Sequence, residues 1–306
     1  MWSYTLRRLL VTIPTLLAVI TVCYVLVHSA PGGPFDSEVN VSEAVLANLN
    51  AKYHLNEPAW KQYLLYLNNL LHGDLGASFR YADWSVNDLV AAALPVSAAI
   101  GGISLLISFV IGVTLGIAAA LRQNSIADYL VMLVGNLGSV FPSFVIGPVL
   151  VLVFALMLHW LPAGGWDGFA PAFMVMPIAL LTFINVSTIA RVMRGSLIEV
   201  LHSNFIRTAR AKGLPTRLVV MRHALKPALL PVISVMSPLA ISSITAALVT
   251  ETVFSLPGLG KLIVNGAGNR DYTLVLGLVV LITVIAVTLN LLADLAYAAL
   301  DPKIRY

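Results

Sequence analysis

Six long apolar stretches run through this chain and constrain its fold more than any other feature. Five of them carry no Lys, Arg, Asp or Glu, and the sixth carries one acid, Asp294. A helix of about 20 apolar residues crosses the hydrocarbon core of a bilayer, and a helix satisfies its own backbone groups in lipid. The stretches are 9–28, 95–121, 129–158, 173–190, 228–250 and 274–299. They predict an all-α polytopic membrane protein with six transmembrane helices.

The composition supports this prediction. Hydrophobic residues make up 59% of the 306 residues and charged residues 10%, whereas soluble chains carry about 25% charged residues. The mean hydropathy is +0.91. The formal charge of +4 does not indicate nucleic-acid binding, because the positive residues lie in short segments between apolar stretches. A single cysteine, Cys23, excludes an internal disulfide and a Cys-rich site, and we expect no bound metal.

Three regions follow from the pattern. Residues 1–30 hold the first transmembrane helix, whose apolar run is longer than the roughly 7 to 15 residues of a cleaved signal peptide, so we expect it to be retained. Residues 31–94 are polar, with three basic residues against seven acids, and predict an extracytoplasmic subdomain. Residues 95–306 predict a five-helix transmembrane domain with a cytoplasmic loop at 191–227.

The polar region contains one clear amphipathic helix. Its apolar face consists of Trp60, Tyr63, Leu64, Leu67 and Leu71. We favour packing of this face against the protein's own membrane domain over a docking surface for another protein. Further on, Ser85 and Asp88 have the spacing of a capping box that starts the next helix.

The distribution of basic residues predicts the orientation in the membrane. Thirteen of the eighteen Lys and Arg residues fall on one side if the N-terminus is cytoplasmic. Since basic residues favour cytoplasmic segments, we expect both termini and the 191–227 loop inside. Residues 31–94 and 251–273 then face outward.

The segment 191–226 holds eight of the eighteen basic residues and one acid, Glu199. Its centre has Ser203 and Asn204 at a helix start, Gly213 at a helix stop and Pro215 just beyond. We expect Phe205 and Ala209 on one face of this short helix. A free helix this short is only marginally stable, so we favour docking to a partner over contact with anionic lipid alone.

Further runs complete a resemblance that extends nearly end to end. They are Lys52-Tyr53-His54-Leu55, Gly73-Asp74-Leu75-Gly76, His159-Trp160-Leu161-Pro162, Glu251-Thr252-Val253-Phe254, Pro257-Gly258-Leu259-Gly260 and Asp301-Pro302-Lys303. With 194–215, they resemble the B-type inner-membrane permease subunits of bacterial oligopeptide ABC importers, in the peptide/nickel permease family. The general importer loop begins Glu-Ala-Ala, whereas this chain has Arg207-Thr208-Ala209, which suits the peptide branch.

The resemblance implies a non-catalytic permease that forms half of an ATP-driven peptide uptake path. Its implied partners are a second homologous permease, two cytoplasmic ATPase subunits, an extracytoplasmic peptide-binding protein, the peptide substrate and membrane lipid. ATP and Mg would bind the ATPases, and this chain would bind no cofactor. Closure of the ATPases would move the short helix, called the coupling helix, and switch the path from inward to outward access. Dipeptide and nickel importers share this pattern and stay open as alternatives.

The resemblance also implies two sets of functional residues. The ATPase-coupling set is Glu199, Ser203, Asn204, Phe205, Arg207, Thr208, Arg210, Ala211 and Gly213. The outer gate set is Glu251, Phe254, Pro257, Gly258 and Gly260.

Catalytic motifs are missing from the sequence. Gly258-Leu259-Gly260-Lys261 is not a phosphate-binding loop, because Ser255 replaces its first Gly and Leu262 its Ser or Thr. No H-E-x-x-H or G-x-S-x-G motif occurs, so we expect no enzyme.

Polar residues inside the apolar stretches are possible pathway residues, namely Asn136, Asn185, Asn290 and Asp294. For any single one we favour helix packing, and for Asp294 a position near the membrane surface is an equal alternative. Gly112 and Gly116 form a GxxxG pair, for which we favour packing within the chain. An ion-coupled transporter or a membrane scaffold would need no ATPase, and nothing local supports either class.

Overall fold

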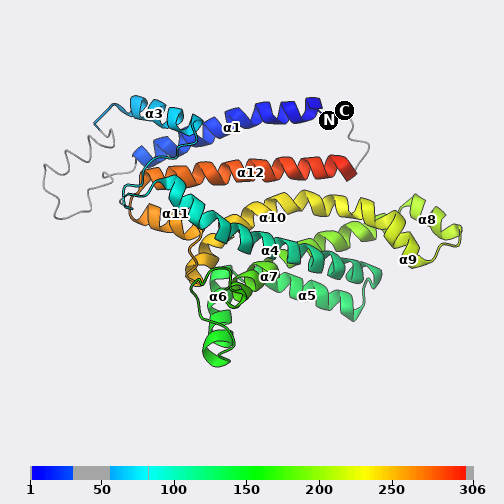
Figure 1. Cartoon of the computed structure of the whole chain (residues 1–306). Helices are drawn as coiled ribbons and strands as arrows, with labels where there is room; N and C mark the ends of the chain where they lie inside the picture. Colours follow the sequence, from blue (N-terminus) through cyan, green and yellow to red (C-terminus); the bar gives the residue numbers. More distant parts are fainter. Residues whose placement is uncertain (1, 30–55, 82, 301–306) are drawn as a thin grey trace.

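The computed structural model describes residues 2–29, 56–81 and 83–300. Residues 30–55 of the expected extracytoplasmic subdomain therefore lie outside the described part. The described residues form helices that mostly run side by side (Figure 1). The first helices along the chain are α1 (Trp2–Ser29), α3 (Ala59–Leu71), α4 (Val86–Leu121), α5 (Ile126–Val140), α6 (Ser143–Leu150) and the π-helical η1 (Val151–Met157). The remaining helices are α7 (Pro171–Leu201), α8 (Asn204–Ala211), α9 (Thr216–Val219), the π-helical η2 (Val220–Ala224), α10 (Leu225–Val253), α11 (Leu259–Gly268) and α12 (Tyr272–Leu300).

Four described helical segments are long and apolar enough to cross a membrane. They are Val86–Leu121, Pro171–Leu201, Thr216–Val253 and Tyr272–Ala293. Helices α5 and α6–η1 add a fifth if the bent pair is one span, and the apolar part of α1, Ile13–Ser29, is shorter. The predicted all-helical membrane fold is thus confirmed, with four to five candidate spans among the described residues.

The stretch 129–158, predicted to form one transmembrane helix, is broken into two. Helices α5 and α6 meet at 99°. The break falls at Phe141, which is extended at ψ 122°, and at Pro142, which precedes the first residue of α6. Proline disfavours a helical conformation in the residue before it, so this position is where the helix stops.

The long packing contact between α4 and α7 depends on the GxxxG pair. A Cβ atom on Gly112 would lie 2.7 Å from Ile189 Cβ, and one on Gly116 would lie 2.7 Å from the carbonyl oxygen of Ala190. These distances leave no room for a side chain. Packing within the chain, which the sequence favoured, therefore explains both glycines.

We expect Gly116→Val to lower the free energy of unfolding of the purified protein by about 1–3 kcal/mol. The added side chain overpacks the contact and forces the backbones of α4 and α7 apart. Gly102→Val is the matched control, since a Cβ atom at Gly102, also on α4, meets nothing within 4 Å. Unfolding followed by circular dichroism would measure both. Equal unfolding temperatures for the two variants would contradict this account of the packing.

Helix α3 packs on α1, and a capping box starts α4. Tyr63 of α3 has its hydroxyl 2.6 Å from Thr21 Oγ1, and its ring packs on Tyr24 of α1 at 5.0 Å between centroids. Part of the predicted apolar face of α3 therefore packs on the membrane domain, whereas Trp60, Leu64 and Leu71 stay exposed. The predicted capping box of Ser85 and Asp88 is present and starts α4 at Val86.

Candidate functional site

Helix α8 begins and ends where the sequence predicts. Ser203 is the extended residue before its first turn, and Gly213 follows its end at φ +78°. The Gly213 N–H donates to the Arg210 carbonyl at 2.9 Å and the Leu214 N–H to the Ala209 carbonyl at 3.4 Å, a Schellman stop. The Ser203 hydroxyl makes no cap, because it donates to the Val200 carbonyl at 2.6 Å instead.

The buried face of α8 is formed by Ile206 and Ala209. They lie in a core shared with Leu197 of α7 and Val219 of α9. Phe205, expected on one face with Ala209, lies one turn before it and is 51% exposed. The buried stripe is centred between Ile206 and Ala209, which leaves Phe205 on its flank. The core holds a helix that would be unstable alone.

The exposed residues of α8 form what we call the coupling surface, at one end of the bundle (Figure 1). Its members are Asn204, Phe205, Arg207, Thr208, Arg210 and Ala211. Glu199 and Gly213 are exposed beside it, and Ser203 is half-buried. The coupling surface carries one exposed aromatic ring, that of Phe205, and two exposed arginines, Arg207 and Arg210, on a helix held by its own core.

Part of the basic segment serves the chain's own structure. Arg194 of α7 donates two hydrogen bonds, of 2.5 and 2.6 Å, to the carboxylate of Asp128 in the first turn of α5. Arg191 donates to Asn136 Oδ1 at 3.0 Å. Sequence reasoning missed the first pair, although Asp128 stands out as an acid between two uncharged stretches. Two arginines of the basic segment therefore join α7 to α5 through side-chain hydrogen bonds.

The expected outer gate residues meet at a buried carboxylate. Glu251, fully buried near the end of α10, accepts hydrogen bonds from the Gly260 N–H at 2.8 Å and the Lys261 N–H at 3.2 Å. Ser97 of α4 donates its hydroxyl to Glu251 at 2.5 Å and accepts the Leu259 N–H at 2.9 Å. The first three N–H groups of α11 are thus capped from α4 and α10. We call these residues the outer cluster.

Two positions at the outer cluster, Gly258 and Gly260, have no room for a side chain. A Cβ atom at Gly258 would lie 2.2 Å from the Glu251 carboxylate, and one at Gly260 would lie 2.3 Å from the Leu248 Cα. Phe254 is buried and its carbonyl accepts the Gly165 N–H at 2.8 Å, whereas Pro257 is exposed. Of the predicted set, Glu251, Gly258 and Gly260 therefore lie together, and sequence reasoning missed their partner Ser97.

The possible pathway residues do not gather at one place. Asn185 is buried and donates to Ser243 Oγ at 2.9 Å, which joins α7 to α10. Asn290 on α12 is exposed and accepts from Ser237 of α10 at 2.5 Å. The side chain of Asp294 lies outside the described part.

A groove of about 370 Å³ lies between α4, α10 and α12. Its wall includes Ser97 of the outer cluster, the adjacent glycines Gly101 and Gly102, and Leu289 next to Asn290. Most of the remaining wall is apolar. The groove therefore runs from the outer cluster toward the polar contact between α10 and α12.

Comparison with known sequences gives a family and full-length relatives. Residues 112–306 match the model of the family described as binding-protein-dependent transport system inner membrane component. The oligopeptide transport system permease protein OppB of Escherichia coli (strain K12) is 53% identical over 306 residues, which is 100% of both chains. The dipeptide transport system permease protein DppB of Bacillus subtilis (strain 168) is 39% identical, over 100% of this chain and 98% of its own.

Comparison of folds agrees with the sequence match. The chain is similar to one in the inward facing structure of the MetNI methionine ABC transporter in its CY5 native crystal form, with a TM-score of 0.58 and 17% identity. The similarity covers 70% of this chain and 96% of the other. At this identity it supports the fold alone.

Proposed function

Because this chain belongs to the family of binding-protein-dependent transport system inner membrane components, we propose that it is the permease of an ATP-driven oligopeptide importer. It is a multi-pass component of the inner membrane and the non-catalytic part of its transporter. The observation that carries the proposal is the 53% identity to an oligopeptide permease over the whole chain. The coupling surface supports it, since a rigid, exposed, basic helix suits a cytoplasmic partner.

The proposed assembly has four kinds of subunit. This chain and a second homologous permease each form half of the path, two cytoplasmic ATPases bind ATP and Mg, and a peptide-binding protein delivers cargo outside. We further propose six spans, with α1 as the first and α5–α6–η1 as the third. Both termini are then cytoplasmic. In support, the N-terminal end of α1 and the C-terminal end of α12 lie at the same end of the bundle as α8 (Figure 1).

We assign the coupling surface to the ATPases. ATP drives transport only if the two states of the permease differ in their contacts with the ATPases. Ile206 and Ala209 anchor α8 in the core, so a displacement of α8 must move the ends of α7 and α10 with it. Phe205 is the exposed aromatic residue of this surface and is proposed to make its main apolar contact with the ATPases.

We assign the outer cluster to the outer gate and the adjacent groove to the path. The cluster joins α4, α10 and α11 through Glu251, so opening of the path on the outside has to move these helices together or break the cluster. Asn290 is the polar residue proposed to face the path, because it is exposed beside the groove. Asn185, buried between α7 and α10, is proposed to hold those helices together, and Asn136 to orient Arg191.

Purification of the tagged chain from native membranes tests the assembly. The wild-type chain is expected to copurify with two ATPases and a second permease, and Phe205→Asp to lose the ATPases while keeping the permease, because a carboxylate replaces the ring that makes the main apolar contact. Phe169→Asp is the matched control, since Phe169 is similarly exposed at 57% and lies in the link before α7. Recovery of the wild-type chain alone would overturn the proposal.

A dipeptide importer is the second candidate, favoured by the 39% identity to the dipeptide permease. Vesicles that hold the complete importer would distinguish the two. Competition of labelled tetrapeptide uptake by longer peptides but not by dipeptides is expected for an oligopeptide importer, and the reverse for a dipeptide importer.

A further inference from the structure

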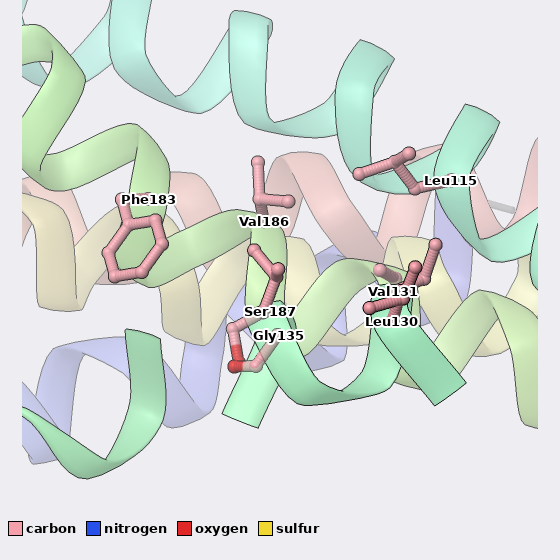
Figure 2. A pocket seen from close by; sticks show the side chains of 9 residues that line it. Leu115, Leu130, Val131, Gly135, Phe183, Val186 and Ser187 are labelled. Carbon is pink, nitrogen blue, oxygen red and sulfur yellow. The ribbon is translucent and has the colours of Figure 1, made fainter. Parts of the chain in front are cut away.

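A second groove opens between α4, α5 and α7. It has a volume of about 280 Å³ and an almost entirely apolar wall (Figure 2). Leu115 comes from α4, Leu130 and Val134 from α5, and Phe183 and Val186 from α7. Leu130 and Val134 are 54% and 50% exposed, so the groove opens onto the outside of this chain.

Positive charge gathers where these helices reach the end of the bundle that carries α8. The short link 122–125 joins α4 to α5 there and begins with Arg122, which is exposed. Arg191 is also exposed and directly follows Ala190, which lines the groove. Its bond to Asn136 orients the guanidinium, which has five N–H donors. Asp128, the acid of the first turn of α5, is neutralised by Arg194.

The volume of the groove and its position between apolar helices indicate what kind of molecule it can bind. Sites for whole small molecules measure roughly 300–1,000 Å³, so this groove suits a segment of a flexible apolar chain better than a complete solute. In a bilayer, such a chain is supplied by lipid. Basic margins between transmembrane helices on the cytoplasmic side bind anionic headgroups.

We propose that the α4/α5/α7 groove binds an acyl chain of an anionic phospholipid of the cytoplasmic leaflet, with its phosphate against Arg122 and Arg191. The cytoplasmic placement rests on the proposed function. The lipid then fills the apolar space between three helices and neutralises the charge at their ends. Arg191 lies on α7, which leads directly into α8, so bound lipid also fixes the helix that carries the coupling surface.

Native mass spectrometry of the complete importer in detergent tests the headgroup. Phosphatidylglycerol is expected to bind more tightly than phosphatidylethanolamine with the same chains. The double variant R122Q/R191Q should bind phosphatidylglycerol roughly 30-fold more weakly, the change expected for two basic residues beside an anionic headgroup. R217Q/R222Q, which removes two exposed arginines of α9 and η2, should leave the affinity unchanged. Equal affinities in wild type and R122Q/R191Q would overturn the proposal.

A photoactivatable phosphatidylglycerol with its reactive group in the acyl chain tests the groove without relying on a variant. In the wild-type importer, labels are expected on peptides that contain 130–135 and 183–190, and Val134→Trp, which fills the groove from an exposed position, should remove them. Label that appears elsewhere on this chain or on the second permease but not on these peptides of the wild-type importer would overturn the proposal. The mass spectra also report subunit composition, so absence of the ATPases, which would contradict the proposed function, is recognised separately.

Discussion

Gly213→Pro should abolish peptide uptake while leaving the amount of membrane-inserted protein unchanged. Gly213 has φ +78° and donates its N–H to Arg210, whereas proline fixes φ near −65° and has no N–H. The substitution therefore destroys the stop of α8 and redirects the chain into α9. Insertion depends on the apolar spans, which are untouched. Uptake of labelled peptide by cells and the level of inserted protein in membranes would be measured together.

Gly213→Asn separates the backbone conformation from glycine itself. Asparagine tolerates the left-handed conformation and keeps the N–H, and a Cβ atom at Gly213 meets nothing within 4 Å. We expect this variant to retain most of the uptake. Normal uptake by a correctly inserted Gly213→Pro protein would refute a rigid α8 as the element that transmits force.

Glu251→Ala should destabilise the outer cluster and stop transport. It leaves the Ser97 hydroxyl and the N–H groups of Gly260 and Lys261 without their acceptor. Each buried polar group left unpaired costs about 1–3 kcal/mol, so a loss of about 3 kcal/mol or more is expected. The measurement is the thermal unfolding of the purified importer, with peptide uptake in vesicles as the functional readout.

Two further variants serve as controls for Glu251→Ala. Glu251→Gln keeps an acceptor oxygen in the same place and should lose less stability than Glu251→Ala. Glu199→Ala applies the same truncation to an exposed glutamate and should leave the unfolding temperature unchanged. If the Glu251→Ala and Glu199→Ala variants unfold at the same temperature, Glu251 does not hold α4, α10 and α11 together.

Features encoded locally could be predicted from the sequence. The stop of α8 at Gly213 and the capping box at Ser85 each depend on neighbours within four residues. The close contact at Gly116 could be predicted because small residues four apart allow helices to approach. Apolar length alone predicted the membrane fold.

Features that depend on distant residues could not be predicted. Ser97 and Glu251 are 154 positions apart, and neither sequence context indicates the other. Which side of α8 is buried depends on where the core of α7 and α9 lies, so helical spacing alone could not predict that Phe205 is exposed. The break falls at Pro142, a helix-breaking residue visible in the sequence, but no local signal predicts the 99° angle between α5 and α6.

The length of α7, a single helix, turns a small rotation of this helix into a larger displacement at its end. Its 31 residues extend about 46 Å. Its first residue follows the link in which Gly165 is bonded to Phe254, and its last turn leads into α8. A rotation of α7 by about 5° about its first residue displaces its other end by about 4 Å. A displacement of α8 no longer than a side chain therefore corresponds to only a small rotation of α7.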